Sequence, residues 1–260
     1  MPLMSPSISV VVPSYNDAAM LERCLTALDA QTRKADEVIV VDNGSSDTTV
    51  EVAVAHGARV VTELRRGIPQ ATAAGLDAAT CDVVGRLDAD SVPPRTWVAR
   101  LARAFDRDPD LDVLSGPAEY YGGNGFQRWV AEYLHMPMYY GPVAWFLGHD
   151  VVYGSNFAVR RTAWRELRTL VHRDDREVHD DLDITLNIPP GMRVRFDQTL
   201  VVGASARPYT SFDRWSRQFR MAFYTFGVNH TEVSLFERRR RWVDWKAAQG
   251  GEGDTVRATR

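Results

Sequence analysis

The sequence predicts an α/β fold in which helices cover both faces of a mostly parallel central sheet. In the first third of the chain, short β-branched runs alternate with segments of helical periodicity, which is typical of βαβ units. The runs are apolar at successive positions, as expected of strands whose two faces are both buried. The expected strands are residues 8–12, 37–41, 59–62 and 83–87, with helices at 18–30, 47–56 and 69–79.

The rest of the chain is less regular. A helix ending near Phe105 and a strand near Val113 are expected. Residues 118–153, rich in Tyr, Trp, Gly, Met and Pro, predict long loops with one helix at 125–134. There follow a strand and helix at 154–170, an acidic turn at 174–183, strands at 193–196 and 200–202, and two amphipathic helices. We expect a single domain over residues 1–248 and a disordered tail at 249–260, which has little to bury.

Composition and charge exclude several classes of protein. The 260 residues, 45% of them hydrophobic, suffice for one buried core without a disulfide framework. Cys24 and Cys81 lie far apart and have no Cys or His at zinc spacing, so no zinc site is expected. The net charge of -3 gives no general attraction to nucleic acid, and no nucleic-acid partner is expected.

The longest apolar stretch, residues 136–153, is interrupted by Pro, Gly, His and Asp, which argues against a membrane-spanning helix. The first residues lack the basic and apolar regions of a signal peptide. We therefore expect a cytoplasmic protein, either soluble or attached peripherally at the inner face of the membrane.

Polar residues follow the first two expected strands, where ligands of such sheets bind. They are Pro13, Ser14, Tyr15 and Asn16 after the first strand and Asp42 after the second. Pro13 ends its strand and turns the chain, so that Ser14 and nearby backbone groups can face a ligand. Each segment is equally compatible with an ordinary turn or helix cap, and neither decides the question alone.

Asp88 and Asp90 stand at the end of the fourth expected strand. Two like charges side by side in a cleft are costly unless a cation compensates them. Mg²⁺ or Mn²⁺ would do so, because both take carboxylate oxygens and complete their shell with phosphates and water. An isolated Asp-x-Asp is more often a solvated turn, but its place after this strand favours a metal site.

A second acidic cluster comprises Asp180, Asp181 and Asp183. A helix dipole accounts for one or two acids at a helix start, but less well for three. A carboxylate here can serve as the general base that deprotonates a hydroxyl nucleophile. Asp181 is the candidate, and Asp180 is the alternative if the register differs by one. The neighbouring His179 is the histidine most suited to a role in the site.

These four segments, in this order, resemble the family 2 glycosyltransferases, which are inverting enzymes with the GT-A fold and a Rossmann-like sheet. The resemblance covers residues 8–200 and implies a role for each segment. Nucleotide binding falls to Pro13, Ser14, Tyr15, Asn16, Asp42 and Asp88, metal binding to Asp90 and Asp88, and donor-sugar or acceptor binding to Gly154, Ser155, Asn156 and Asp180. It places the nucleotide-binding half at residues 1–115 and the acceptor-binding half at 116–248.

Two departures from the family pattern affect phosphate binding. The Arg-Asn pair common before the acidic strand is missing at residues 71–75, so Arg65, Arg66 with Gly67, or Arg86 is expected to supply that contact. The downstream His that completes the metal shell in many relatives is missing at residues 202–207. Arg207, or Arg217 in the following helix, is expected to bind phosphate instead.

The resemblance implies transfer of a sugar from a UDP- or GDP-linked donor to a hydroxyl of a glycan, glycolipid or small molecule. Mn²⁺ or Mg²⁺ is the implied cofactor, and cell-envelope polysaccharide, glycolipid or other glycoconjugate synthesis is the implied setting. An inactive domain that docks on a membrane or partner stays open, because residues 129–146 are aromatic and residues 238–241 are arginines. A sugar nucleotidyltransferase is less favoured, since residues 12–16 are not a glycine-rich loop. A homodimer also stays open.

Overall fold

A twisted sheet forms the centre of the molecule. The structure, a computed structural model, describes residues 5–209 and 211–257, and of residues 133–140, 208, 212 and 250–257 only the backbone. Within this part the main sheet has seven strands in the order β3-β2-β1-β4-β7-β5-β8. They are β1 (Ile8–Ser14), β2 (Glu37–Asp42), β3 (Arg59–Thr62), β4 (Val83–Arg86), β5 (Leu111–Ser115), β7 (Phe157–Arg160) and β8 (Arg193–Phe196).

Most neighbouring strands of this sheet are parallel. β1 to β4 pair in parallel, as do β5 and β8, whereas β7 runs antiparallel to both β4 and β5. The predicted α/β fold with a mostly parallel sheet is therefore confirmed. Because β1 and β4 are neighbours, the segments after their carboxyl ends, which begin at Tyr15 and Leu87, meet at one edge of the sheet.

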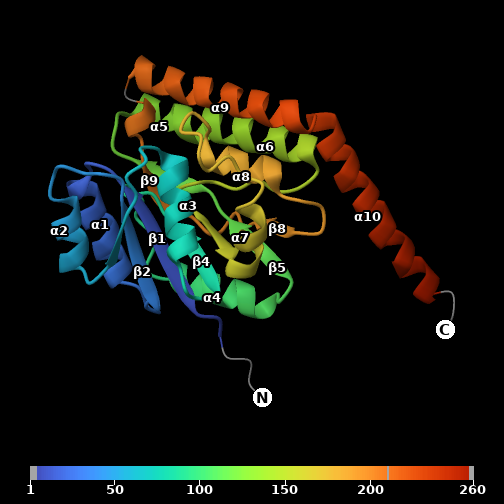
Figure 1. Cartoon of the computed structure of the whole chain (residues 1–260), viewed down its shortest axis with the longest axis horizontal. Coiled ribbons are helices and arrows are strands. Elements are labelled where there is room, and N and C mark those ends of the chain that lie inside the picture. Colours follow the sequence, from blue (N-terminus) through green and yellow to red (C-terminus); the bar gives the residue numbers. More distant parts are fainter. Residues whose placement is uncertain (1–4, 210, 258–260) are drawn as a thin grey trace.

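Helices cover both faces of the sheet (Figure 1). On one face α1 (Ala18–Asp29), α2 (Thr49–Ala55) and α4 (Trp97–Arg107) pack on Val10 and Val12 of β1. On the other face α3 (Ile68–Ala78), α7 (Arg161–Leu167) and α8 (Asp180–Asn187) pack around Val11. Alternate residues of β1 thus enter opposite cores, and each fully buried Val contributes about 1.5–3 kcal/mol of burial free energy.

The segment between β5 and β7 differs from the prediction of long loops. It contains β6 (Ala118–Tyr121), α5 (Gly125–Trp129), a π-helix (Val130–His135) and α6 (Met136–Leu147). Pro142 lies inside α6, and prolines normally interrupt helices. Packing outweighs that preference, because Leu147, with Val143 and Phe146 beside it, contacts Leu182 and Leu186 of α8.

Two further helices follow a small second sheet. β6 pairs in parallel with β9 (Val202–Ser205), and a 3₁₀ turn (Arg207–Tyr209) leads to α9 (Phe212–Glu232) and α10 (Leu235–Arg257). α10 is helical to Arg257, whereas the sequence indicated a disordered tail at residues 249–260. Residues 258–260 lie outside the described residues.

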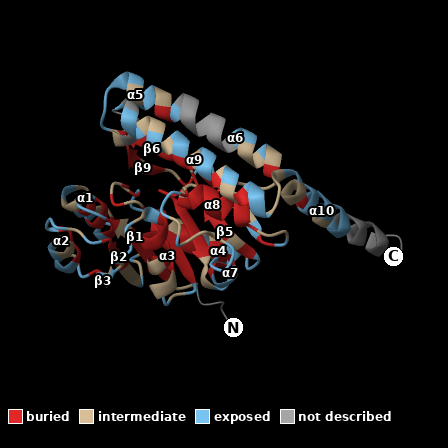
Figure 2. Cartoon of the chain, turned by 45° about the horizontal axis from the view of Figure 1, so that its top comes forward, coloured by how far each residue is buried: buried red, intermediate tan, exposed pale blue. Residues whose placement is uncertain are grey.

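The helices α5, α6 and α9 with the π-helix between α5 and α6 lie side by side over one edge of the main sheet (Figures 1 and 2). We call residues 125–147 and 212–232 the helical layer. In the part of the chain that the structure describes, no helix combines the length and the apolar character needed to cross a bilayer.

Candidate active site

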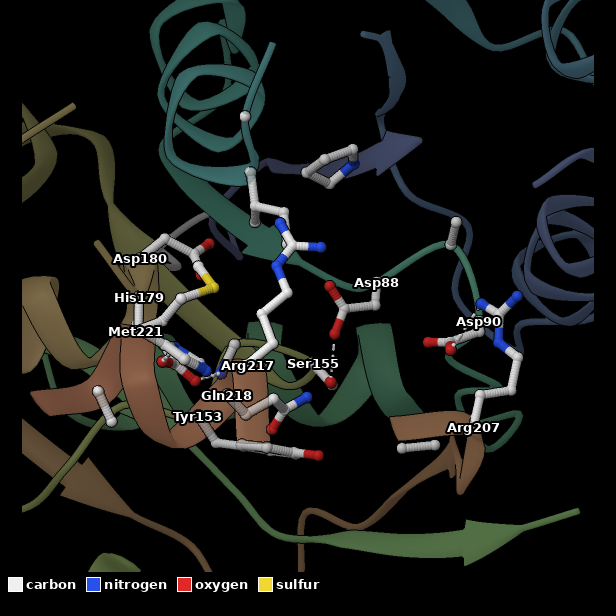
Figure 3. A pocket seen from close by; sticks show the side chains of 18 of the residues that line it. Asp88, Asp90, Tyr153, Ser155, His179, Asp180, Arg207, Arg217, Gln218 and Met221 are labelled. Atoms are coloured by element: carbon white, nitrogen blue, oxygen red, sulfur yellow. Dashed lines mark hydrogen bonds and ion pairs between the residues drawn. The ribbon is translucent and has the colours of Figure 1, made fainter. Parts of the chain in front are cut away.

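A cavity of about 1280 Å³ lies between the carboxyl ends of the strands and the helical layer. Loops after β1, β2 and β4 line it from the sheet side, the start of α8 lies at its base, and α9 lines it from above. Figure 3 shows acidic and basic side chains pointing into it from several elements. The predicted site residues on its wall are Pro13, Ser14, Tyr15, Arg66, Gly67, Asp88, Asp90, Gly154, Ser155, Asp180, Asp181, Arg207 and Arg217.

Three predicted site residues do not line the cavity. Asn156 is fully buried, accepts a hydrogen bond from the indole N–H of Trp97 at 2.9 Å and donates to the Pro117 carbonyl at 3.1 Å. Its polar atoms thus hold the core together, and its predicted contact with donor sugar or acceptor stays a prediction. Asn16 and Asp42 accept hydrogen bonds from Ser46 N–H at 2.7 Å and Ser45 N–H at 2.9 Å. They shape the loops after β1 and β2, and a nucleotide contact by either stays a prediction.

Asn43, which the sequence reasoning did not single out, lines the cavity beside Asp42. Its amide donates to the Glu63 and Arg65 carbonyls at 2.7 and 2.8 Å and accepts from Gly67 N–H at 2.9 Å. These bonds fix the loop that carries Arg66. The guanidinium carbon of Arg66 lies 3.2 Å from the ring centroid of the exposed Tyr15, a cation–π contact at the cavity wall. Such a pair can hold a planar base or a phosphate.

Each acid of the predicted metal pair faces an arginine. Asp88 pairs with Arg86 at 2.8 Å and accepts a hydrogen bond from the Ser155 hydroxyl. Asp90 pairs with Arg207 at 2.9 Å. Burial, followed by the nearby Asp88 carboxylate, raises the pKa of Asp90 to about 6, although Arg207 acts in the opposite direction. The Asp90 anion is therefore only partly compensated by the protein.

Arg86 joins the two acidic clusters from beneath the cavity. It is fully buried and donates to Asp180 at 3.1 Å as well as pairing with Asp88. Burial alone would lower the pKa of Arg86, but the carboxylates around it raise the value, so the guanidinium stays charged. Arg65, the other arginine considered from the sequence, instead pairs with Glu63 and Asp174 and does not line the cavity.

Asp180 and Asp181 occupy different environments although they are adjacent. Asp180 accepts from the Thr72 hydroxyl at 2.8 Å and from Arg86, and burial raises its pKa. Asp181 accepts from Gly154 N–H at 2.7 Å. Its other carboxylate oxygen lies 2.5 Å from His179 Nδ1, an ion pair whose alignment is not that of a hydrogen bond.

The charge of His179 sets the state of Asp181. Burial would raise the pKa of Asp181, but the His179 imidazolium and the Gly154 N–H lower it overall. Burial would likewise lower the pKa of His179, yet Asp181 raises it to about 9. At neutral pH Asp181 is thus a carboxylate, whereas Asp180 is the acid that is protonated more readily. Enzymes commonly give the two members of an acid pair different protonation states in this way.

Two groups of side chains could hold a metal. Among the described residues, His179, Asp180 and Asp181 place three ligand atoms within 4.8 Å of one another. The positive charges of Arg86 and His179 already compensate these acids, so little negative charge is left to attract a cation. Asp88 and Asp90 offer two carboxylates on the cavity wall, and the raised pKa of Asp90 indicates room for further positive charge. Their oxygen ligands suit Mg²⁺ or Mn²⁺.

The aromatic wall of the cavity is the part that the sequence reasoning missed. Tyr120 and Tyr153, whose hydroxyls lie 3.0 Å apart, line it together with Trp215, Phe219 and Phe226 of α9. The spacing of Trp215, Phe219 and Phe223 by four residues marks one face of a helix in the sequence. That spacing does not indicate which surface the face covers.

The first part of the chain matches a known protein family in sequence. A profile of glycosyl transferase family 2 matches residues 9–168, more than half of the chain. The glycosyltransferase AglE of Haloferax volcanii is 30% identical over 128 residues, covering 46% of this chain and 42% of AglE. An uncharacterised glycosyltransferase of Mycobacterium tuberculosis is 38% identical over 105 residues, 40% of this chain and 46% of that protein. The chain thus spans less than half the length of these curated relatives.

Two solved structures share the fold. The glucosyl-3-phosphoglycerate synthase of Mycobacterium tuberculosis, in complex with Mn²⁺, UDP and glucosyl-3-phosphoglycerate, has a TM-score of 0.60 at 24% identity, over 86% of this chain and 80% of that chain. TarS of S. aureus has a TM-score of 0.61 at 17% identity, over 88% and 72%. These two structures show only that the fold is shared, whereas the family profile matches the sequence of residues 9–168. On that match over more than half of its length, this chain belongs to glycosyltransferase family 2.

Proposed function

We propose that this chain transfers a sugar from a nucleoside-diphosphate donor to an acceptor hydroxyl with inversion at the anomeric carbon. One observation carries the proposal. Asp181, whose pKa is lowered, lies on the same cavity wall as the acid pair Asp88 and Asp90. A base for the acceptor and an acidic site for the donor diphosphate thus share one enclosed space.

The donor is proposed to lie over the carboxyl ends of β1, β2 and β4. Ser14, Tyr15 and Arg66 line this part of the cavity, and the Arg66 guanidinium offers a charged, planar partner for a base or a phosphate. Arg207 and Arg217 add two further cations on the wall, and Figure 3 shows Arg217 pointing into the cavity. We propose a UDP- or GDP-linked sugar, and UDP is tested first because the mycobacterial synthase binds it.

Mn²⁺ or Mg²⁺ is proposed as the cofactor, with Asp90 as a ligand and Asp88 beside it. The fit rests on the chemistry of the donor set, namely two carboxylates with an incompletely compensated Asp90 anion. When bound, the ion would offset the negative charge of the departing diphosphate.

The remaining chemistry falls to residues of the chain itself. Asp181 takes the proton of the acceptor hydroxyl while the oxygen attacks the anomeric carbon from the face opposite the diphosphate. The new glycosidic bond forms as the bond to the diphosphate breaks, and the bonding pair leaves with the diphosphate. His179 and Gly154 hold Asp181 in its ionised form before the proton arrives. The proposed setting is cell-envelope polysaccharide, glycolipid or other glycoconjugate synthesis on the cytoplasmic side of the membrane.

Thermal-shift binding tests this function. UDP, GDP, dTDP and CDP would be added with and without Mn²⁺ to the native chain and to the Asp90→Ala and Asp181→Asn variants. We expect one diphosphate to raise Tm in a metal-dependent way, an effect lost in Asp90→Ala and kept in Asp181→Asn. If no diphosphate raises Tm of the native chain, the transferase proposal fails and a domain that only docks on a partner becomes the better account.

A further inference from the structure

The exposed phenylalanine and tryptophan side chains gather on a few helices in the second half of the chain. Among the residues whose side chains the structure describes, every exposed Phe and Trp lies on α5, α6, α9 or α10. They are Phe126, Trp129, Trp145, Phe219, Phe223 and Phe236. Phe126, Trp145, Phe223 and Phe236 are each 72–73% exposed. Soluble proteins rarely leave so many large rings in water on neighbouring elements unless the surface binds something apolar.

The same helices carry positive charge. The helical layer contains four Lys or Arg against three Asp or Glu, and residues 235–249 of α10 add five against two, although the whole chain has a net charge of -3. On α9 the exposed Arg214 and Arg220, which do not line the cavity, lie close to Phe219 and Phe223 in sequence. A surface that mixes aromatic rings with arginines is complementary to anionic lipid headgroups above an apolar layer.

The cavity opens onto this surface. Val130 and Val143 line it from the π-helix and α6, and Phe219, Phe223 and Phe226 line it from α9. Because Phe219 and Phe223 are both exposed and part of the lining, they stand at its mouth. Figure 2 shows exposed residues along α5, α6 and α9, with the buried sheet beneath them. An acceptor reaching Asp181 by this route passes between aromatic and aliphatic side chains.

We propose that the helical layer is a docking surface for an anionic membrane and that it turns the cavity mouth toward the lipid. The aromatic rings enter the headgroup region while the arginines pair with lipid phosphates. An acceptor anchored in that membrane then presents its hydroxyl to Asp181 without leaving the lipid. The acceptor part of this inference rests on the proposed function, whereas membrane docking does not depend on catalysis.

Vesicle binding tests the docking surface. The native chain would be sedimented with vesicles of phosphatidylcholine alone and of phosphatidylcholine mixed with phosphatidylglycerol. We expect binding to the anionic vesicles only, weakened by added salt. The double variant Phe126→Ser and Trp129→Ser should bind at least about tenfold more weakly, since each ring removed forfeits apolar burial. Arg220→Glu should also weaken binding and reduce its salt dependence.

A matched control is Val54→Ser, which removes an exposed apolar side chain from α2, away from the helical layer. It should bind vesicles like the native chain. The Tm increment given by UDP and Mn²⁺ is measured on every variant, to show that a variant with weakened vesicle binding is still folded. A native chain that binds nucleotide but no anionic vesicles would overturn the docking proposal and leave the proposed function standing. Equal binding by the double variant and the native chain would overturn the assigned surface. If the native chain binds no vesicles and sediments as a dimer, whereas the double variant sediments as a monomer, the surface is an interface between two copies of this chain.

The orientation of the cavity mouth has its own readout. Cys24 is buried, so with Cys81→Ser a single environment-sensitive dye can be attached at Phe223→Cys or, as control, at Val54→Cys. On anionic vesicles the dye at position 223 should shift to shorter wavelength while the dye at position 54 does not. A chain that binds vesicles with no shift at 223, or with equal shifts at both positions, does not face the lipid with its cavity.

Discussion

The guanidinium of Arg207 lies 2.9 Å from the carboxylate of Asp90. It also pairs with Asp17, so one cation from the segment after β9 joins two acids beside the carboxyl ends of β1 and β4. Arg207 is about two-fifths exposed and lines the cavity, which leaves its side chain able to turn toward a bound phosphate. The sequence offers no histidine at residues 202–207, and the structure places this arginine at the acid proposed to bind the metal.

Replacing Arg207 by Gln should weaken donor binding. A charge-assisted hydrogen bond to a phosphate is worth about 1.5–3 kcal/mol, so the Kd for the nucleoside diphosphate should rise by about ten- to a hundredfold. Calorimetric titration with UDP and Mn²⁺ measures this. Arg220→Gln, at an exposed arginine of α9 outside the cavity lining, is the matched control and should leave the Kd unchanged. Equal affinity of the two variants would restrict Arg207 to pairing with Asp17 and Asp90.

The Asp181→Asn variant should lose catalysis and keep donor binding. An amide cannot accept the acceptor proton, and loss of a general base costs about 10²–10⁴-fold in kcat. Asp180→Asn is the informative comparison, because Asp180 is held by Thr72 and Arg86. It should retain more activity than Asp181→Asn in a donor-turnover assay. The reverse order would move the base to Asp180.

His179 should set the pH range over which Asp181 acts. The pKa of His179 is raised to about 9, so its stabilising ion pair is fully present below about pH 6.5 and is lost as pH rises through about 9. Removing the cation by His179→Gln should raise the pKa of Asp181, because burial then lacks its main opposing charge. The acidic limb of kcat/KM against pH should therefore move to higher pH in the variant. An unchanged limb would mean that His179 has no influence on the base.

Much of the fold could be predicted because its signals are local. The strands from Ile8 to Arg86 are β-branched runs bounded by turns, and they match the structure to within two residues. Acids placed directly after strands could be assigned to the site for the same reason, since parallel strands bring their carboxyl ends together. Asp88 and Asp90, which follow β4, line the cavity as that reasoning expects, whereas Asp42 at the end of β2 does not.

What could not be predicted depends on contacts between distant segments. The Pro and Gly residues of 136–147 indicated loops, yet packing of Leu147 against α8 keeps α6 helical. Asn156 stands in a segment that resembles a ligand-binding one, but only the fold shows Trp97 and Pro117 beside it. Likewise, the ion pair of Arg207 with Asp90 joins residues 117 positions apart, which no local pattern specifies.

Asn156→Ala should destabilise the protein without a specific effect on catalysis. Truncation leaves the Trp97 indole N–H without its hydrogen-bond acceptor in the core and should lower the free energy of unfolding by about 1–3 kcal/mol. Denaturant unfolding measures this change. At a temperature where the variant is folded, its KM for donor and its kcat should match those of the native chain. A large rise in KM with unchanged stability would return Asn156 to the binding site.

Gly154→Ala should disable the active site by moving Asp181. A Cβ at this position would lie 2.9 Å from Arg86 Nη1 and 3.0 Å from an oxygen of Asp181, both closer than such atoms normally approach. The displaced carboxylate loses its bond from Gly154 N–H, and a misplacement of about 1 Å can cost on the order of 10²-fold in kcat. Gly227→Ala in α9, where an added Cβ meets no atom within 4 Å, is the control and should retain activity. Full activity of Gly154→Ala, measured as donor turnover, would show that Asp181 needs no such close support.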